Sequence, residues 1–246
     1  MFILPSEYWE VRKTKAKGQG IFAKKDIPGG IVIGDYLGKL IHSSEEADYE
    51  EKYGFYTMYY HQKASIVPDP KKPGIHTINH SCEPNTYMYT YQGHTLYFSL
   101  RKIFKGEELT VSYLISPLDK DCEPCTHFCY CDSEMCSDTM HATHKVYDAW
   151  REFDEPMMNS VKLPRVKYGS QLEKLPSYPE TIPDNNIYPL FGSTHKPAID
   201  ISDTKIASQK ELHKKIRETG QKLHFKKLGI TIAGIADDHI ICKADK

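Results

Sequence analysis

The seven residues Asn79-His80-Ser81-Cys82-Glu83-Pro84-Asn85 place two amides, an imidazole and a thiol within one short stretch. A fold does not require such a density of polar groups at one place, whereas a binding or catalytic site does. Amide side chains satisfy the hydrogen bonds of small polar ligands, and a cysteine thiolate is a common zinc ligand. The stretch therefore predicts a site that combines two kinds of chemistry.

Five of the seven cysteines lie close together, between Cys122 and Cys136. We expect no secretion signal, because Pro5 interrupts the apolar start of the chain. Clustered cysteines without such a signal are more often metal ligands than disulfides. Cys129-x-Cys131-x4-Cys136 offers three thiols within eight residues. The cluster therefore predicts a zinc site, which takes four ligands.

The bulk properties limit the classes of protein to consider. The chain has 246 residues, 39% of them apolar, and a formal net charge of −1. This size suits one large domain or a domain with an appendage. The longest apolar run, Ile230–Ala236, is far too short to cross a bilayer, and no basic field of the kind used for DNA binding is present. We expect an intracellular protein, nuclear or cytoplasmic, that binds neither membranes nor nucleic acid directly.

The elements that must position these residues are mostly short strands. Residues 8–114 alternate strand-like runs with turn signals, which predicts a mainly β core that includes a hairpin over residues 86–101. A short acidic helix is predicted for Ser43–Tyr53. Residues 151–246 form a proline-containing extension, either docked on the core or a linker, that ends in an α/β appendage. The appendage comprises a helix at Asp203–Thr219 and a hairpin around Asp237-Asp238.

Four blocks of this chain resemble, in order, the sequence blocks of SET-domain protein lysine methyltransferases. They are Gly18-x-Gly20, Tyr36-x-Gly38, Asn79–Asn85 and Gly106–Tyr113. The resemblance runs from about Tyr8 to Cys136. It implies a SET-domain fold with a knot-like substructure, and S-adenosylmethionine and zinc as cofactors. It divides the chain into a SET domain (8–116), a post-SET-like zinc-binding segment (117–150) and the extension (151–246).

The resemblance also implies roles for individual residues. Tyr113 is expected to be the catalytic phenol that orients the substrate amine, Tyr56 to line the lysine channel, and Tyr36 is a weaker candidate for the same wall. The residues expected to bind the cofactor are Lys17, Gly18, Gly20, Asn79, His80 and Tyr113.

For the metal, the resemblance implies that Cys82 completes a site with Cys129, Cys131 and Cys136. Without it, Cys122 and Cys125 together with Cys129 and Cys131 also supply four thiolates, which leaves Cys82 and Cys136 free. His127 and His141 are further candidate ligands, and a second metal is an alternative. The simplest interpretation of Cys122 and Cys125 is that they are free thiols.

The implied activity is transfer of a methyl group to a lysine side chain of a protein, with histones as the first guess. The alternatives are a non-catalytic SET module that binds a peptide or partner, and a plain zinc-stabilised interaction protein. The chain departs from the family at His76-Thr77-Ile78, where an Arg-aromatic pair is common, and at Ser112, where Asp is usual. No aromatic follows Cys136, so we expect Tyr147 or Trp150 to cover the cofactor, or no residue to do so.

Overall fold

The structure is a computed structural model in which part of the chain is described. The side chains described belong to residues 1–61, 63–119, 122, 125–133, 136–142, 144, 147–148, 151–152 and 166–181. Beyond these, only the backbone of four short strands between residues 223 and 240 is described. The predicted helix at Asp203–Thr219 lies outside the described residues.

The described elements are short, and strands dominate. Helix α1 (Glu46–Tyr53) follows a 3-10 turn, η1 (Ser43–Glu45), and a second such turn, η2 (Ile75–Thr77), precedes the central motif. The strands are β1 (Trp9–Lys13), β2 (Gln19–Ala23), β3 (Val32–Asp35), β4 (Lys39–His42), β5 (Met58–His61), β6 (Ala64–Val67), β7 (Asn79–His80), β8 (Thr86–Tyr91), β9 (His94–Ser99), β10 (Glu108–Val111), β11 (Leu223–Phe225), β12 (Ile230–Ile232), β13 (Ile235–Ala236) and β14 (His239–Ile240). The predicted mainly β class, the helix after residue 43 and the hairpin β8–β9 are confirmed.

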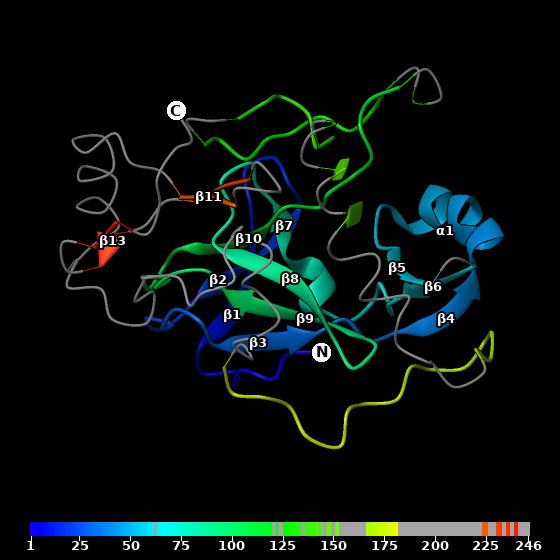
Figure 1. Cartoon of the computed structure of the whole chain (residues 1–246), viewed down its shortest axis with the longest axis horizontal. Coiled ribbons are helices and arrows are strands. Elements are labelled where there is room, and N and C mark those ends of the chain that lie inside the picture. The colour runs from blue at the N-terminus through cyan, green and yellow to red at the C-terminus, as the bar shows by residue number, and fades with distance from the viewer. Residues whose placement is uncertain are drawn as a thin grey trace.

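Three small sheets surround the core, in the orders β1-β2-β10-β7, β3-β9-β8 and β4-β6-β5 (Figure 1). The pairing of β10 with β7 is parallel and joins Thr110 to Asn79 and Val111 to His80. On its other edge β10 pairs with β2 through Glu108 and Leu109. One short strand thus holds the third and fourth sequence blocks against the first. The threading of a loop beside these strands stays a prediction.

The core between the sheets consists of aliphatic side chains together with several tyrosines, and most strands contribute to it. Ile21, Ile33, Ile66 and Leu109 are fully shielded from solvent. Burying each such side chain contributes roughly 1.5–3 kcal/mol relative to leaving it in water. Because these residues come from all three sheets, the core fixes the positions of the sheets relative to one another.

Part of the C-terminal extension docks on the core. Figure 1 shows residues 166–181, in yellow, along the outside of β3 and β4. The backbone N–H of Leu172 donates to the carbonyl of Gly38 at 2.8 Å, and that of Val32 donates to the carbonyl of Glu180 at 2.9 Å. Of the two interpretations of the proline-containing segment, docking therefore holds for residues 166–181.

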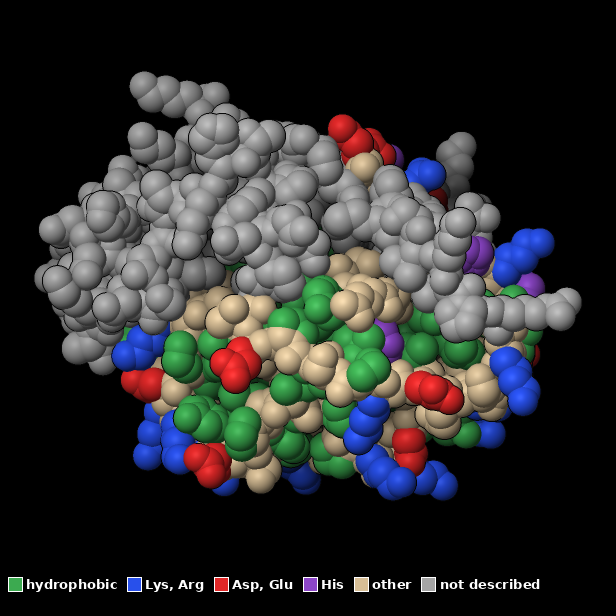
Figure 2. Space-filling model, turned by 60° about the horizontal axis from the view of Figure 1, so that its bottom comes forward, with side chains coloured by type: hydrophobic (Ala, Val, Ile, Leu, Met, Phe, Trp, Pro, Cys, Tyr) green, Lys and Arg blue, Asp and Glu red, His purple; other side chains and the backbone are tan. Residues whose placement is uncertain are grey.

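Charged side chains of both signs lie on the described part of the surface. On the face shown in Figure 2, Lys and Arg side chains lie around the rim and are interspersed with Asp and Glu. Within the described part of the chain, no helix has the length and apolar character needed to span a membrane.

Candidate active site and metal centres

A cavity of about 530 Å³ lies where the first, third and fourth sequence blocks meet. This volume is typical of pockets for small ligands and cofactors. Six of the predicted site residues line it, namely Lys17, Gly18, Tyr56, Asn79, His80 and Tyr113. The other lining residues are Ala16, Gln19, Gly54, Phe55, Pro70, Lys71, Lys72, Pro73, His76, Thr77, Thr126, Phe128, Cys129, Tyr130 and Met140.

One end of the cavity carries an ammonium and an amide that are held in place by the same carboxylate. The Lys17 Nζ atom lies 2.7 Å from Oε2 of Glu108, and the amide of Asn79 donates to Oε1 of Glu108 at 2.8 Å. The same amide also donates to the carbonyl of Gln19 at 2.9 Å. Glu108 reaches both partners because β10 lies between β2 and β7. This arrangement can satisfy the charges and hydrogen bonds of an amino-acid head group.

Two phenols face another part of the cavity. The hydroxyl of Tyr113 lies 3.2 Å from the carbonyl of Ile78, to which it donates, and Tyr56 is also in the lining. Burial, and then the neighbouring Tyr56, raise the pKa of Tyr113 well above its usual value. Tyr113 is therefore a protonated hydrogen-bonding group at neutral pH, and it is suited to orient an amine.

Tyr36 and Gly20 support the cavity from behind and are not among its described lining residues. The hydroxyl of Tyr36 donates to the backbone carbonyl of Tyr56 at 2.6 Å, and its ring lies in the core. Burial raises the pKa of Tyr36 well above the usual range. The geometry gives Tyr36 the position of a residue that holds Tyr56 in place.

The side chain of His80 joins the cavity to the cysteine cluster. Its Nδ1 accepts a hydrogen bond from the backbone N–H of Tyr113 at 3.2 Å, which leaves Nε2 to carry the proton. Nε2 lies 3.6 Å from the sulfur of Cys82. Burial, and then the nearby Lys17 ammonium, lower the pKa of His80 to about 4, so the ring is neutral at physiological pH.

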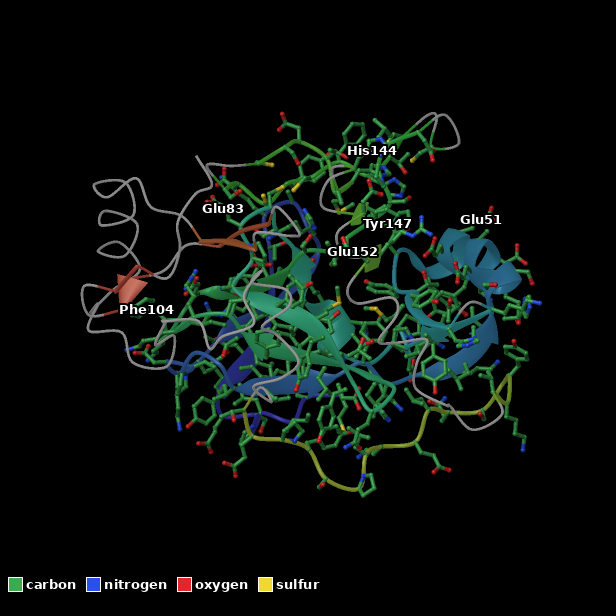
Figure 3. The ribbon with its side chains drawn as sticks, in the orientation of Figure 1. Glu51, Glu83, Phe104, His144, Tyr147 and Glu152 are labelled. Carbon is green, nitrogen blue, oxygen red and sulfur yellow. The ribbon has the colours of Figure 1, made fainter. Side chains whose placement is uncertain are left out.

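The structure brings together the four cysteines that the sequence resemblance selected. The sulfurs of Cys82, Cys129, Cys131 and Cys136 all lie within 4.8 Å of one another, and those of Cys82 and Cys129 are 3.7 Å apart. A tetrahedral zinc site with bonds of about 2.3 Å places its sulfurs about 3.8 Å apart, so this donor set fits zinc. Figure 3 shows sulfur atoms gathered near Glu83, above β7 and β10.

A second group of metal-ligand side chains lies in the same segment. Cys122 and Cys125 are neither isolated thiols nor grouped with Cys129, because their sulfurs gather with ring nitrogens of His127 and His141 within 4.8 Å. Their interpretation as free thiols stays a prediction, and the alternative of a second metal has a compatible donor set here. The sequence had presented both histidines as further candidate ligands.

Two aromatic side chains other than Tyr147 and Trp150, the residues expected to cover the cofactor, lie at the cavity. Phe128 and Tyr130 line the cavity, and each is 57% exposed. Tyr147, labelled in Figure 3, is not among the described lining residues, and Trp150 lies outside the described part of the chain. The alternation of ligand and aromatic residues from His127 to Cys131 is the pattern from which this cover could have been found.

Comparison with known proteins identifies one matching family and a set of relatives. Residues 18–114 match the model of the SET domain. The chain is 32% identical over 139 residues to "Histone-lysine N-methyltransferase trithorax" of Drosophila virilis. This alignment covers 53% of this chain and 4% of the relative. It is also 32% identical over 136 residues to "Histone-lysine N-methyltransferase, H3 lysine-36 specific" of Eremothecium gossypii. That alignment covers 51% of this chain and 19% of the relative.

A third relative is the "Variant-silencing SET domain-containing protein" of Plasmodium falciparum, 30% identical over 141 residues, with 52% of this chain and 5% of the relative covered. In these three alignments the chain therefore spans between 4% and 19% of the relative's length.

Proposed function

We propose that the chain is a protein-lysine N-methyltransferase that uses S-adenosylmethionine. Residues 18–114 are a SET domain, and a cysteine cluster of the post-SET kind follows this domain. The observation that carries the proposal is the shared cavity. It joins Lys17, Asn79 and His80 at one part of its wall to the phenols of Tyr56 and Tyr113 at another.

The donor set of the cavity fits the cofactor. We assign Lys17, Gly18, Asn79, His80 and Tyr113 to its binding, and Gly20 to the support behind them. When bound, S-adenosylmethionine supplies an electrophilic methyl group on a sulfonium ion. The fixed pair of Asn79 and Lys17 is suited to a charged amino-acid head, and the open backbone at Gly18 allows close approach of a ligand.

The phenols provide the positioning that methyl transfer needs. In the reaction a carbon–nitrogen bond to the lysine amine forms as the carbon–sulfur bond breaks, and the amine must first have lost a proton. Tyr113 and Tyr56 hold the neutral amine by hydrogen bonds, and Tyr36 keeps Tyr56 in position. Because the phenol of Tyr113 stays protonated, it does not act as a base, and the proton leaves through solvent.

For the substrate, we propose a lysine in a protein, with histones first because two of the relatives are named histone-lysine N-methyltransferases. We accordingly expect an intracellular protein with a nuclear site of action.

We place the functional unit at residues 8–116 because β1, which precedes the matched region, pairs along its whole length with β2. Residues 117–150 are its zinc-binding segment.

The test is methyl transfer by the purified full chain from labelled S-adenosylmethionine to mixed histones and to cell lysate. We expect transfer, and we expect Tyr113→Phe to lower it at least ~100-fold, because misplacement of the reacting groups alone costs that much. The matched control is Tyr91→Phe, since Tyr91 lies outside the cavity lining and this change should leave the rate unchanged.

Two results would replace the proposal with an alternative. Binding of S-adenosylhomocysteine in calorimetry without any transfer would favour a non-catalytic SET module that binds a peptide or partner. The family departures at His76-Thr77-Ile78 and Ser112 would then be its explanation. Failure of the chain to bind S-adenosylhomocysteine at millimolar concentrations would favour a zinc-stabilised interaction protein.

A further inference from the structure

A second cluster of soft donor atoms lies beside the cavity, in residues 122–141, and the proposed reaction does not use it. Its four ligand atoms are the sulfurs of Cys122 and Cys125, Nδ1 of His127 and Nε2 of His141. The two nitrogens are 3.0 Å apart. The sulfur of Cys122 lies 3.2 Å and 3.4 Å from them, and that of Cys125 lies 3.7 Å and 3.4 Å away.

These separations match the edges of a zinc tetrahedron. With zinc–sulfur bonds of about 2.3 Å and zinc–nitrogen bonds of about 2.0–2.1 Å, the edges are about 3.5 Å between sulfur and nitrogen and about 3.3 Å between nitrogens. Two thiolates and two imidazoles also form one of the common structural zinc sets. Within the described residues, these four atoms lie close to one another.

The surroundings orient the ligands toward a common centre. The Nδ1 atom of His141 is hydrogen-bonded to the carbonyl of Ser116, so this nitrogen carries the proton and Nε2 turns its lone pair toward the cluster. Metal-bound histidines commonly have such a carbonyl partner on the other ring nitrogen. In addition, the backbone N–H of His127 donates to the sulfur of Cys125 at 3.4 Å.

The same extended segment carries ligands of both clusters and a wall of the cavity. Side chains alternate between the two sides of an extended chain. His127, Cys129 and Cys131 belong to the metal clusters, and Phe128 and Tyr130 between them line the cavity, to which Cys129 also contributes. The segment is braced against residues 138–140, where the N–H groups of Cys129 and Met140 donate to the carbonyls of Asp138 and His127 at 3.0 Å and 2.9 Å.

We propose that Cys122, Cys125, His127 and His141 bind a second structural zinc ion, so that the chain holds two. The ion anchors the near end of the extended segment, while the four-cysteine site anchors its far end. Phe128 and Tyr130 are thereby fixed between two metal centres. The further consequence, that the second ion sets the position of the cofactor's aromatic cover, rests on the function proposed above.

The first experiment measures the metal in the full chain, expressed without a histidine tag. Mass spectrometry of the metal content should give two zinc ions per chain. X-ray absorption should give an average of about three sulfur and one nitrogen neighbours per ion, because the two clusters together offer six sulfurs and two nitrogens. One zinc per chain with only sulfur neighbours would overturn the proposal. These readouts do not depend on methyl transfer, so they stand or fall separately from the proposed function.

Variants then assign the second ion to its ligands. The double change Cys122→Ser and Cys125→Ser should remove one ion of two and leave about four sulfur neighbours around the other. His127→Cys keeps four ligands, so it should retain both ions while the average rises to about 3.5 sulfurs. Cys242→Ser is the matched control, because each cluster already has four ligand atoms without it, and it should retain two ions. Retention of both ions by the double variant would refute the assignment.

The affinity for S-adenosylhomocysteine tests the consequence for the cavity. The double variant should bind it at least about tenfold more weakly than the wild type, because the wall that carries Phe128 and Tyr130 loses one anchor. Unchanged affinity in a variant that has lost one zinc would show that the second ion does not position the wall. If the wild type binds two zinc ions but no S-adenosylhomocysteine, the metal site holds and the proposed function fails.

Discussion

Gly20 is the position at which a single methyl group should disturb the cofactor end of the cavity. It lies in β2 behind the lining, next to the contact between Asn79 and Glu108. A Cβ atom there would stand 2.6 Å from Oε1 of Glu108 and 2.8 Å from the amide nitrogen of Asn79. Both distances are shorter than real contacts of a Cβ atom, so Gly20→Ala must displace one of the two side chains.

The expected magnitude follows from the contact that is lost. The Cβ would also stand 2.9 Å from Cγ2 of Thr14, so Thr14 must shift as well. The other two atoms that it would meet are ends of flexible side chains, so their cheapest response is rotation of Asn79 or Glu108 and loss of their 2.8 Å hydrogen bond. Hydrogen bonds to a charged group are worth about 1.5–3 kcal/mol. At about 1.4 kcal/mol per factor of ten, Gly20→Ala should weaken binding of S-adenosylhomocysteine by roughly 10- to 150-fold.

The assay is calorimetry of S-adenosylhomocysteine binding, with thermal unfolding measured alongside. Gly106→Ala is the control, because Gly106 has a φ of +87° and a Cβ atom there would meet no heavy atom within 4 Å, so the change strains the backbone without intruding on a neighbour. It should lower stability by about 1–2 kcal/mol and leave affinity unchanged. The reasoning is refuted if a folded Gly20→Ala protein binds as tightly as Gly106→Ala.

Three further predictions concern stability, pH and metal. Arg101→Ala should cost about 3–5 kcal/mol in chemical denaturation, because it leaves the buried carboxylate of Glu107 unpaired, whereas Arg12→Ala in an exposed pair should cost about 1 kcal/mol or less. Burial raises the pKa of Glu107, but the Arg101 guanidinium outweighs burial and holds this pKa low. The stabilisation by the pair should therefore be complete above the ordinary pKa of a Glu and should fade as pH falls through the lowered value. Equal pH dependence of stability in wild type and Arg101→Ala would contradict this reasoning. The initial rate of methyl transfer should rise between pH 7 and about 10 as the substrate amine loses its proton, with no fall from ionisation of Tyr113, whose pKa is raised; a maximum near pH 8 would contradict this. A strong chelator should remove zinc and weaken cofactor binding together, as followed by metal analysis and calorimetry, and full affinity in the metal-free chain would separate the two.

Local elements of the fold could be predicted from the sequence, and the pairing between distant segments could not. The hairpin β8–β9 and the helix after Ser43 have signals in consecutive residues, namely alternation and an acidic first turn. The strand β7 contains only Asn79 and His80, so it has no periodicity to detect. It exists because β10, some thirty residues further along the chain, pairs with it in parallel. Such pairing depends on tertiary contacts that a linear pattern does not record.

The same limit applies to the site. Lys17, Asn79 and Tyr113 could be selected because they lie in recognisable blocks, and the structure brings them to one cavity. Glu108 lies in such a block too, yet its role in holding Lys17 and Asn79 becomes visible only when β10 is placed between two other strands. Phe128 and Tyr130, which line the cavity, were missed because an aromatic cover was sought only after Cys136.

The stretch from Asn79 to Asn85 has three roles in the structure, where its composition suggested two. Asn79 faces the cavity and Cys82 the four-cysteine cluster, and Asn85 clamps β10. The Asn85 side chain accepts from the N–H of Thr110 at 2.8 Å and donates to the carbonyl of Glu108 at 2.7 Å.

Between these ends, the ring of His80 contacts both the backbone N–H of Tyr113 and the sulfur of Cys82. A change at the metal can thus reach the proposed catalytic tyrosine through one imidazole and two contacts, without any rearrangement of the core. Because β10 is clamped independently by Asn85, loss of zinc should shift Tyr113 while leaving β10 in the sheet. Cys82→Ser should therefore damage metal content and methyl transfer more than it damages the stability of the fold.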